Sequence, residues 1–256
     1  MAARHKTVDR NSRLSGFFNI VAEDLQMLSA LHTREPDADL IQVLRDQQFP
    51  DGLGLKLTSE RGREACEVVA EVLRVLPETM DQAALDDLAA DYASIYLNHR
   101  IQASPEESVW IDEENLTHQD SMFQVRQWYA RYGMAAPDWR TRPDDHLTLE
   151  LEFIGRLLSE QVNQEQLREV GRFMDEHLLR WLMDFAERVA ARCDTPYFAG
   201  MAMLTGVYCE ELRDLIAEVL GEDRPSKEEI EERMQPRAQA ENGVPVKFMP
   251  GMGPAV

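Results

Sequence analysis

Hydrophobic residues recur every three or four positions along most of the chain, with polar residues between them. This spacing is typical of amphipathic α-helices that bury one face, whereas a half-buried strand would alternate residue by residue. The sequence contains no convincing alternating segment and no internal repeat of fixed period. The pattern therefore predicts an all-α globular protein, a helical bundle whose clearest apolar faces lie within residues 14–31, 69–76, 85–96, 123–132, 147–158, 167–189 and 198–219.

Capping residues and helix breakers set the expected ends of these helices. Ser, Thr, Asp and Asn favour the position just before a helix, because their side-chain oxygens accept hydrogen bonds from free backbone N–H groups. The expected caps are Asn11 or Ser12, Asp37, Ser59, Asp81, Asp144, Asn163 and Thr195. Proline and glycine stop helices, and the expected stops are Pro77, Gly133 and Gly221.

Composition along the chain divides it into three parts. Residues 1–13 are basic but are followed by no apolar stretch of the secretory type, so we expect an N-terminal tail rather than a signal sequence. Residues 14–221 are long enough for one multi-helix domain with its own core. In residues 222–256, Ser226 and Glu229 can start a short acidic helix. The Pro- and Gly-containing stretch after Gln235 has little to bury, which predicts a flexible tail.

The chain is strongly acidic, with 47 Asp and Glu against 27 Lys and Arg and a net charge of −20. Such a surface repels nucleic-acid phosphates and anionic lipid, which argues against nucleic-acid binding and membrane insertion. It favours a basic partner and a fast encounter with one. The plainer alternative is that the charge only keeps the protein soluble.

Signatures of catalysis and of metal binding are missing. The sequence has no phosphate-binding glycine loop, no His-Glu-x-x-His zinc motif, no Gly-x-Ser-x-Gly elbow and no Glu-x-x-His pair. Cys66, Cys193 and Cys209 are odd in number and far apart, which indicates packed thiols in a reducing compartment. No segment has the apolar length of a membrane span. We therefore expect a cytoplasmic protein that is not an enzyme and carries no cofactor or metal.

Two polar segments are candidate binding sites. Pro143 is followed by Asp144, Asp145 and His146, with Glu150 one helical turn further on, and these side chains could receive Arg or Lys of a peptide. The alternatives are a plain acidic helix cap with an incidental histidine, or two metal ligands at His146 and Glu150. The second segment, residues 98–116, is irregular and carries Pro105, Trp110 and an acidic run. Trp110 is either a buried anchor or a partner contact, and Tyr92 and Tyr96, four residues apart, are either core or site.

Four stretches resemble the TorD/DmsD family of redox-enzyme maturation chaperones: DYASIYLNH at 91–99, SPEESVW at 104–110, RPDDHLTLELEF at 142–153 and HLLRWL at 177–182. Their order and separation agree with the family over roughly residues 14–220, and the third stretch is the most specific. Arg142 departs from the acid that is usual in the family, and Ile95-Tyr96 replaces a Leu-Phe pair. The segment from residue 222 lies outside the resemblance.

The resemblance implies an all-α chaperone, monomer or dimer, that binds the twin-arginine signal peptide and the apo catalytic subunit of a molybdopterin oxidoreductase. Such a chaperone assists cofactor insertion and prevents premature export. Matched by position, the peptide-binding residues would be Pro105, Trp110, Pro143, Asp145 and His146, to which the clustering above adds Glu150, Tyr92 and Tyr96. A helical adaptor with no link to export, or a cofactor-carrying bundle, remain the alternative readings.

Overall fold

A computed structural model describes residues 2–111, 116, 119–137, 141–159 and 162–234, with side chains described from Ser12 onward. The chain divides into two compact units, residues 1–224 and 225–256. Within the described residues all regular structure is helical, as the hydrophobic pattern predicts, and the one strand-like pairing is an isolated bridge between Glu106 and His146.

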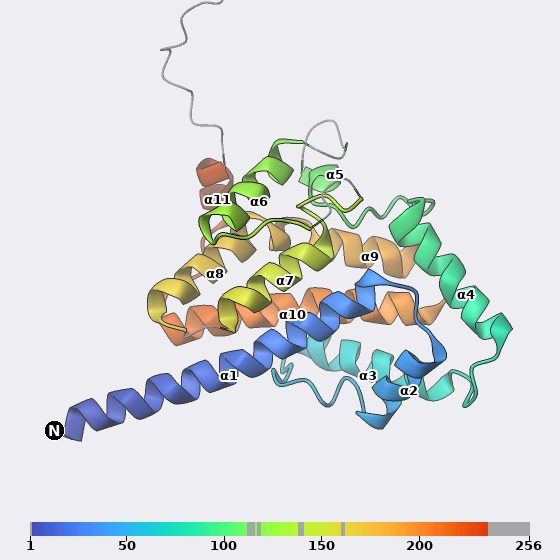
Figure 1. Cartoon of the computed structure of the whole chain (residues 1–256), viewed down its shortest axis with the longest axis horizontal. Helices are drawn as coiled ribbons and strands as arrows, with labels where there is room; N and C mark the ends of the chain where they lie inside the picture. The colour runs from blue at the N-terminus through green and yellow to red at the C-terminus, as the bar shows by residue number, and fades with distance from the viewer. Residues whose placement is uncertain (1, 112–115, 117–118, 138–140, 160–161, 235–256) are drawn as a thin grey trace, which may run out of the picture. The chain divides into compact units, whose positions relative to one another are not determined.

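The first unit contains ten α-helices (Figure 1). Their bounds are α1 (Ala2–Thr33), α2 (Ala38–Asp46), α3 (Glu60–Val75), α4 (Gln82–Tyr92), α5 (Ser108–Ile111), α6 (Asp120–Arg131), α7 (Leu147–Leu158), α8 (Gln164–Glu176), α9 (Leu182–Arg192) and α10 (Pro196–Leu220). A turn of π-helix, Ala93–Leu97, extends α4, and a turn of 3₁₀-helix, Leu178–Arg180, joins α8 to α9.

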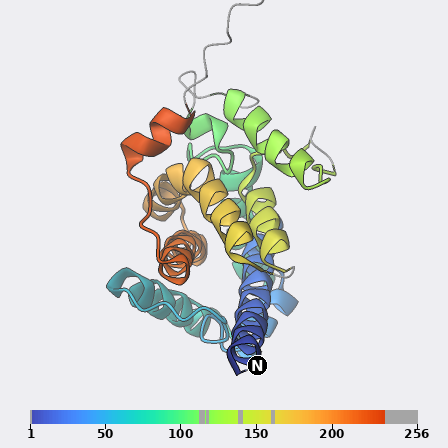
Figure 2. The same cartoon turned by 90° about the vertical axis from the view of Figure 1, so that its left-hand side faces the viewer.

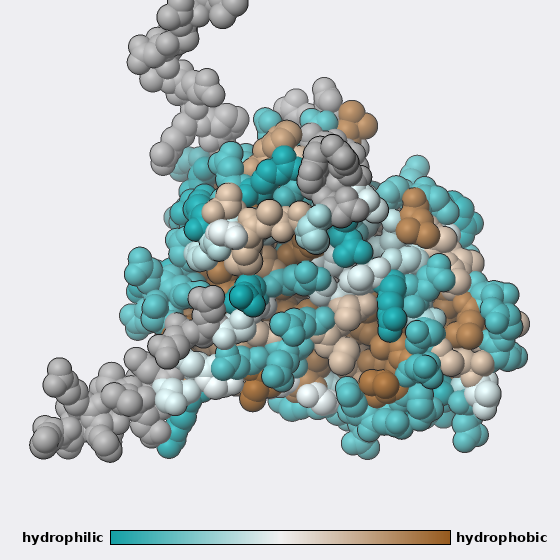
Figure 3. Space-filling view, viewed as in Figure 1, coloured by the Kyte–Doolittle hydropathy of each residue, from teal (hydrophilic) through white to brown (hydrophobic). Residues whose placement is uncertain are grey.

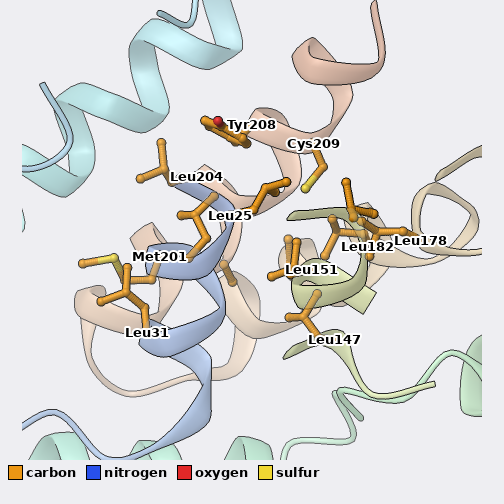
Figure 4. Close-up of a cluster of buried hydrophobic side chains, with 14 of the residues drawn as sticks. Leu25, Leu31, Leu147, Leu151, Leu178, Leu182, Met201, Leu204, Tyr208 and Cys209 are labelled. Atoms are coloured by element: carbon orange, nitrogen blue, oxygen red, sulfur yellow. The ribbon is translucent and has the colours of Figure 1, made fainter. Parts of the chain in front are cut away.

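Helix α10 runs through the middle of the unit, with α3, α8 and α9 packed against it, while α1 and α7 lie side by side (Figures 1 and 2). Gly155 lets α7 approach α1 closely, because a Cβ there would lie 3.3 Å from the Ala22 carbonyl oxygen. The apolar faces converge on a continuous core, in which leucines of α1 and α7 meet Met201, Leu204 and Tyr208 of α10 (Figure 4). Leu147, Leu151, Ile154 and Leu158 are all fully buried, as their spacing predicts.

Several expected caps are confirmed. In four of them the side-chain oxygen of the capping residue accepts a hydrogen bond from the backbone N–H three residues ahead, at 2.8–2.9 Å. These four residues are Asp37, Ser59, Asp81 and Asn163. Gly221 ends α10 in the left-handed conformation, with φ at 69°. In the second unit Ser226 and Glu229 form a reciprocal capping box at the start of the short helix α11 (Lys227–Met234).

Two expected caps are wrong. Helix α1 begins at Ala2, so neither Asn11 nor Ser12 starts it, and the segment 1–13 assigned to a tail is helical from Ala2 onward. Asp144 does not cap α7, because its carboxylate pairs with Arg126 at 2.7 Å and residues 143–146 form a turn. His146 takes the capping position instead.

Thr195 stands at the capping position of α10, but its hydroxyl makes no capping bond. The carboxylate of Asp91 on α4 replaces it, accepting the N–H of Asp194 at 3.0 Å and of Thr195 at 2.6 Å. Helix α10 is therefore capped by a residue from a distant part of the sequence, which ties α4 to the start of the central helix.

Candidate functional site

The two polar segments singled out in the sequence lie against each other. The Leu147 N–H donates to the Pro105 carbonyl at 2.8 Å, and the Glu107 N–H donates to the Asp145 carbonyl at 3.0 Å. The start of α5 and the start of α7 are thus joined by backbone hydrogen bonds. This junction brings Pro105 close to Pro143, Asp145 and His146, although the sequence had offered the two segments only as separate candidate sites.

Asp145 lies inside this junction rather than at its mouth. Its side chain is 0% exposed, and one carboxylate oxygen accepts the Ser108 N–H at 2.9 Å, which caps the short helix α5. Burial raises the pKa of Asp145 to about 6, with a smaller contribution from the carboxylates of Glu107 and Glu106. The midpoint of this carboxyl group's titration therefore lies at about pH 6, well above that of an exposed aspartate.

A second group of acids lies beneath the junction. Glu107 and Glu150 are both 0% exposed, and Glu107 meets the His177 imidazole at 3.0 Å. Burial raises the pKa of Glu150 well above its usual value, and the neighbouring carboxyl groups of Glu107 and Asp145 raise it further. Burial thus favours the neutral, protonated form of Glu150, because an isolated charge in the core would be costly.

His146 is an N-cap residue with a fixed tautomer. Its Nδ1 accepts the Thr148 N–H at 3.2 Å, so the ring proton is on Nε2. Burial, followed by the positive charge of Arg142, lowers the pKa of His146 to about 3, so the imidazole is neutral. The structure gives no hydrogen bond between His146 and Glu150. In the part of the chain that is described, no three His, Cys, Asp or Glu side chains are arranged to hold a metal ion.

Trp110 is half-buried and firmly oriented. Its indole N–H donates to the Ser104 carbonyl at 2.8 Å, and the edge of its ring meets Phe185 at a centroid distance of 6.5 Å. The Arg188 guanidinium carbon lies 4.2 Å from the ring centroid. Trp110 is thus both an anchor of the 98–111 segment and an aromatic surface that a cation can reach.

Tyr92 and Tyr96 fasten the end of α4 to the end of α1. The Tyr92 hydroxyl donates to the Thr33 carbonyl at 2.7 Å, and the Tyr96 hydroxyl lies 2.5 Å from Nδ1 of His32. The Thr205 hydroxyl donates to the Met201 carbonyl, so it accepts from Nε2 of His32 at 2.8 Å. Nδ1 of His32 is then the acceptor for Tyr96, and burial lowers the pKa of His32 to about 4, which keeps the ring neutral.

One feature was missed from the sequence: a cleft of about 560 Å³ between α1, α7 and the chain that follows α6. Its apolar lining comes from Ala30, Met134, Pro137, Leu149 and Phe153. The face that carries α1 and α7 shows apolar residues recessed among hydrophilic ones (Figure 3). No local pattern could have located this cleft, because its walls come from three separate segments.

Among the described residues that line this cleft, Glu152 is the one acid. It is exposed on α7, and the Ser29 hydroxyl donates to its Oε1 at 3.1 Å. The polar lining also includes two basic side chains, Arg34 and Arg156. The alternation in Leu149-Glu150-Leu151-Glu152 thus turns one glutamate into the core and the next toward the cleft.

In the described residues the fold is all-helical with an open cleft on one face, and comparison with known families places the chain. The family model described as "Nitrate reductase delta subunit" matches residues 60–187, half of the chain. The chain belongs to this family.

Curated relatives named "Chaperone protein TorD" match most of the chain. The Photobacterium profundum protein is 28% identical over 199 residues, covering 74% of this chain and 90% of its own. The Shewanella oneidensis protein is 27% identical over 205 residues, covering 76% and 89%. A crystal structure of a candidate redox enzyme maturation protein from Archaeoglobus fulgidus has a TM-score of 0.44 and 21% identity, covering 75% of this chain and 93% of its own.

The family and its chaperone relatives support the general role that the sequence analysis expected, that of a chaperone rather than an enzyme. No helix in the described residues combines the length and the apolarity that a membrane crossing requires.

Proposed function

We propose that this chaperone acts in the cytoplasm on a molybdopterin oxidoreductase. It binds the twin-arginine signal peptide and the apo form of that enzyme, assists cofactor insertion and prevents premature export. The observation that carries this proposal is the open, largely apolar cleft between α1 and α7 with the exposed carboxylate of Glu152 inside it. A peptide with basic residues followed by an apolar stretch has the matching chemistry.

The size and lining of the cleft suit such a peptide. A volume of about 560 Å³ lies within the range of pockets that bury most of a ligand's surface. Leu149 and Phe153 form an apolar wall for the hydrophobic stretch of the signal. Glu152 offers a carboxylate to a cationic side chain, and the net charge of −20 attracts a basic segment from a distance.

The cleft adjoins the residues that the sequence analysis selected. Thr33 lines the cleft and accepts the hydroxyl of Tyr92, while Tyr129 lines it and donates to the Asp144 carbonyl at 2.8 Å. The proposed peptide site therefore runs from the cleft to the junction of α5 and α7.

Within this proposal the selected residues have different roles. Trp110 is half-exposed and contributes the outer contact at the junction, while Pro105, Pro143 and His146 are buried and shape the surface beside it. Asp145, Glu150 and Tyr96 lie beneath that surface, where they hold it in place and set its charge, and Tyr92 connects it to the cleft. The full burial of Asp145 and Glu150 means that a direct contact with the peptide would require the loop around Pro143 to open.

Calorimetric titration with a peptide that carries two adjacent arginines before an apolar stretch tests the proposal. Ala30 is exposed on α1 and lines the cleft, so Ala30→Trp should fill the cleft and weaken binding more than about tenfold, or ~1.4 kcal/mol. Glu152→Gln should weaken it about two- to fivefold, as expected for an exposed charge pair.

Matched controls are available on other helices. Ala90 on α4 and Glu64 on α3 are both exposed and line no part of the cleft, so Ala90→Trp and Glu64→Gln should bind the peptide like wild type. Thermal melts of all four variants verify that they fold. Unchanged affinity in both cleft variants would reject the cleft as the peptide site, and no binding to wild type would reject the proposed function.

A further inference from the structure

Arg188 on α9 is held by an aromatic ring and a backbone carbonyl rather than by a carboxylate. Its guanidinium carbon lies 4.2 Å from the centroid of the Trp110 ring, and its Nη1 donates to the Gln102 carbonyl at 3.1 Å. The side chain is exposed, and the structure pairs it with no carboxylate of the described residues. The sequence contains 47 acids for 27 basic residues, so partners for an arginine are abundant.

Neighbouring arginines are held differently. Arg61 pairs with Glu187, the residue next to Arg188, at 3.0 Å, and Arg100 pairs with Asp194 at 3.4 Å. Arg192, one turn further along α9, donates to the Ile101 carbonyl at 2.9 Å and to Oε1 of Gln102 at 3.0 Å. Of these arginines, Arg188 is the one that rests on an aromatic ring.

The two groups that hold Arg188 are fixed independently of it. The Trp110 ring is oriented by its hydrogen bond to the Ser104 carbonyl and by its edge contact with Phe185. Gln102 has a left-handed backbone, with φ at 56°, and its N–H donates to the His99 carbonyl at 2.8 Å. We call the Trp110 ring face and the Gln102 carbonyl oxygen the guanidinium seat, because both remain in place when Arg188 moves away.

We propose that the guanidinium seat receives an arginine side chain of the client peptide, and that Arg188 occupies the seat in the free chain and is displaced on binding. This inference rests on the proposed function, since it names how the Trp110 end of the site is regulated. A planar guanidinium can stack on the ring and donate to the carbonyl at the same time, which a lysine ammonium does less well. The seat therefore prefers arginine to lysine. Because Arg188 must leave the seat first, the affinity for the client is lower than it would be with an empty seat.

The cost of displacement is modest. A cation–π contact at an exposed site is worth little, and Arg188 gives up one backbone hydrogen bond that water can replace. Removing the internal competitor should strengthen binding of an arginine side chain about two- to fivefold. Replacing arginine by lysine in the client should reduce this gain.

Arginine amide provides a test that does not depend on the client. The indole N–H resonance of Trp110, assigned by its loss in Trp110→Phe, reports on the seat. In Arg188→Ala, millimolar arginine amide should shift this resonance with an affinity about two- to fivefold higher than in wild type. Arg61→Ala removes the same charge from an exposed arginine that pairs with Glu187 and contacts neither part of the seat. It should behave like wild type, which separates displacement from a general loss of positive charge.

The same variants are then titrated with the arginine-containing peptide. Tighter binding to Arg188→Ala alone, with no such gain on a Trp110→Leu background, is the expected result. Equal gains in Arg188→Ala and Arg61→Ala, or weaker binding to Arg188→Ala, would overturn the inference. If the peptide bound none of the variants while arginine amide still distinguished them, the proposed function would be rejected. The guanidinium seat itself would then still be supported.

Discussion

Glu107 and Glu150 lie next to each other in the core, and both are completely buried. Glu107 meets the imidazole of His177, whereas burial beside Glu107 keeps Glu150 protonated. An acidic chain thus places two carboxyl groups in contact inside its core by leaving one of them neutral. This arrangement makes the stability of the fold dependent on pH.

Glu150→Gln should stabilise the protein at pH 7 by about 1 kcal/mol. Glu150 ionises freely in the unfolded chain at this pH, whereas the folded core disfavours the ionised form, and glutamine removes this difference. The raised pKa of Glu150 means that its contribution to stability is complete below pH 4.5 and is lost as pH rises. The advantage of the variant should therefore appear above pH 4.5 in thermal melts and vanish below it. Glu152→Gln on the exposed face of α7 serves as the control, and a destabilised Glu150→Gln would show that Glu150 is ionised.

Tyr96→Phe should destabilise the fold by about 1–2 kcal/mol, since it leaves Nδ1 of the buried His32 without a hydrogen bond. The matched change Tyr92→Phe should cost less, because the Thr33 carbonyl that Tyr92 serves is only partly buried and can turn to water. Urea unfolding followed by circular dichroism measures both. Equal losses in the two variants would contradict the fixed tautomer that we assign to His32.

Asp91→Ala should destabilise the fold by about 1–2 kcal/mol, the loss typical of a helix cap. The substitution frees the backbone N–H groups of Asp194 and Thr195 at the start of α10. Asp91→Asn should lose less, because the amide oxygen can accept one of these bonds. Asp87→Ala, exposed on the same helix, should be close to neutral in the same unfolding experiment, and an equal effect there would exclude capping as the cause.

Within the proposed function, affinity for a basic peptide should fall as pH is lowered through about 6, where the Asp145 carboxylate takes up a proton. Asp145→Asn should remove this pH step and weaken binding at pH 7.5 by about 1–2 kcal/mol. The asparagine oxygen can still accept the Ser108 N–H, so thermal stability should hardly change. Calorimetry at several pH values gives the answer, and unchanged affinity would assign Asp145 to capping α5 alone.

Association with a basic client should slow as ionic strength rises, since the chain carries a net charge of −20 and salt screens charges beyond about 8 Å at physiological strength. Affinity should depend on salt less than the association rate does, because apolar contacts in the cleft persist. Stopped-flow mixing with a labelled peptide separates the two quantities. An association rate that is independent of salt would argue that the charge serves solubility only.

Local sequence signals predicted the features that depend on neighbours in the chain. Asp37, Ser59, Asp81 and Asn163 cap their helices because a cap acts over only three residues. The cap supplied by Asp91 could not be predicted in this way, because its partners are Asp194 and Thr195.

For the candidate site, the sequence suggested which residues to consider but not whether they are buried or exposed. The sequence offered the segments around Pro105 and Pro143 as two separate candidates, and only the structure shows that they lie against each other. A run of polar residues also gives no sign of burial when it is followed along the sequence alone. Asp145 and Glu150 are buried because α5 and its neighbours cover them, a relationship that only the tertiary structure reveals. The cleft was missed for the same reason.

The pairing of Leu147 with Pro105, and of Glu107 with Asp145, also bears on how distant members of this family should be aligned. The two motif segments are fixed to each other in space, so the number of residues between them is not constrained by their contact. Helix α6, which lies between them, must keep Val125, Trp128 and Tyr129 for the core, and residues 134–137 after it line the cleft. Length changes between the two motifs are therefore expected outside these residues. Alignments should therefore treat the two motifs as one signature and leave the length of the insertion between them free.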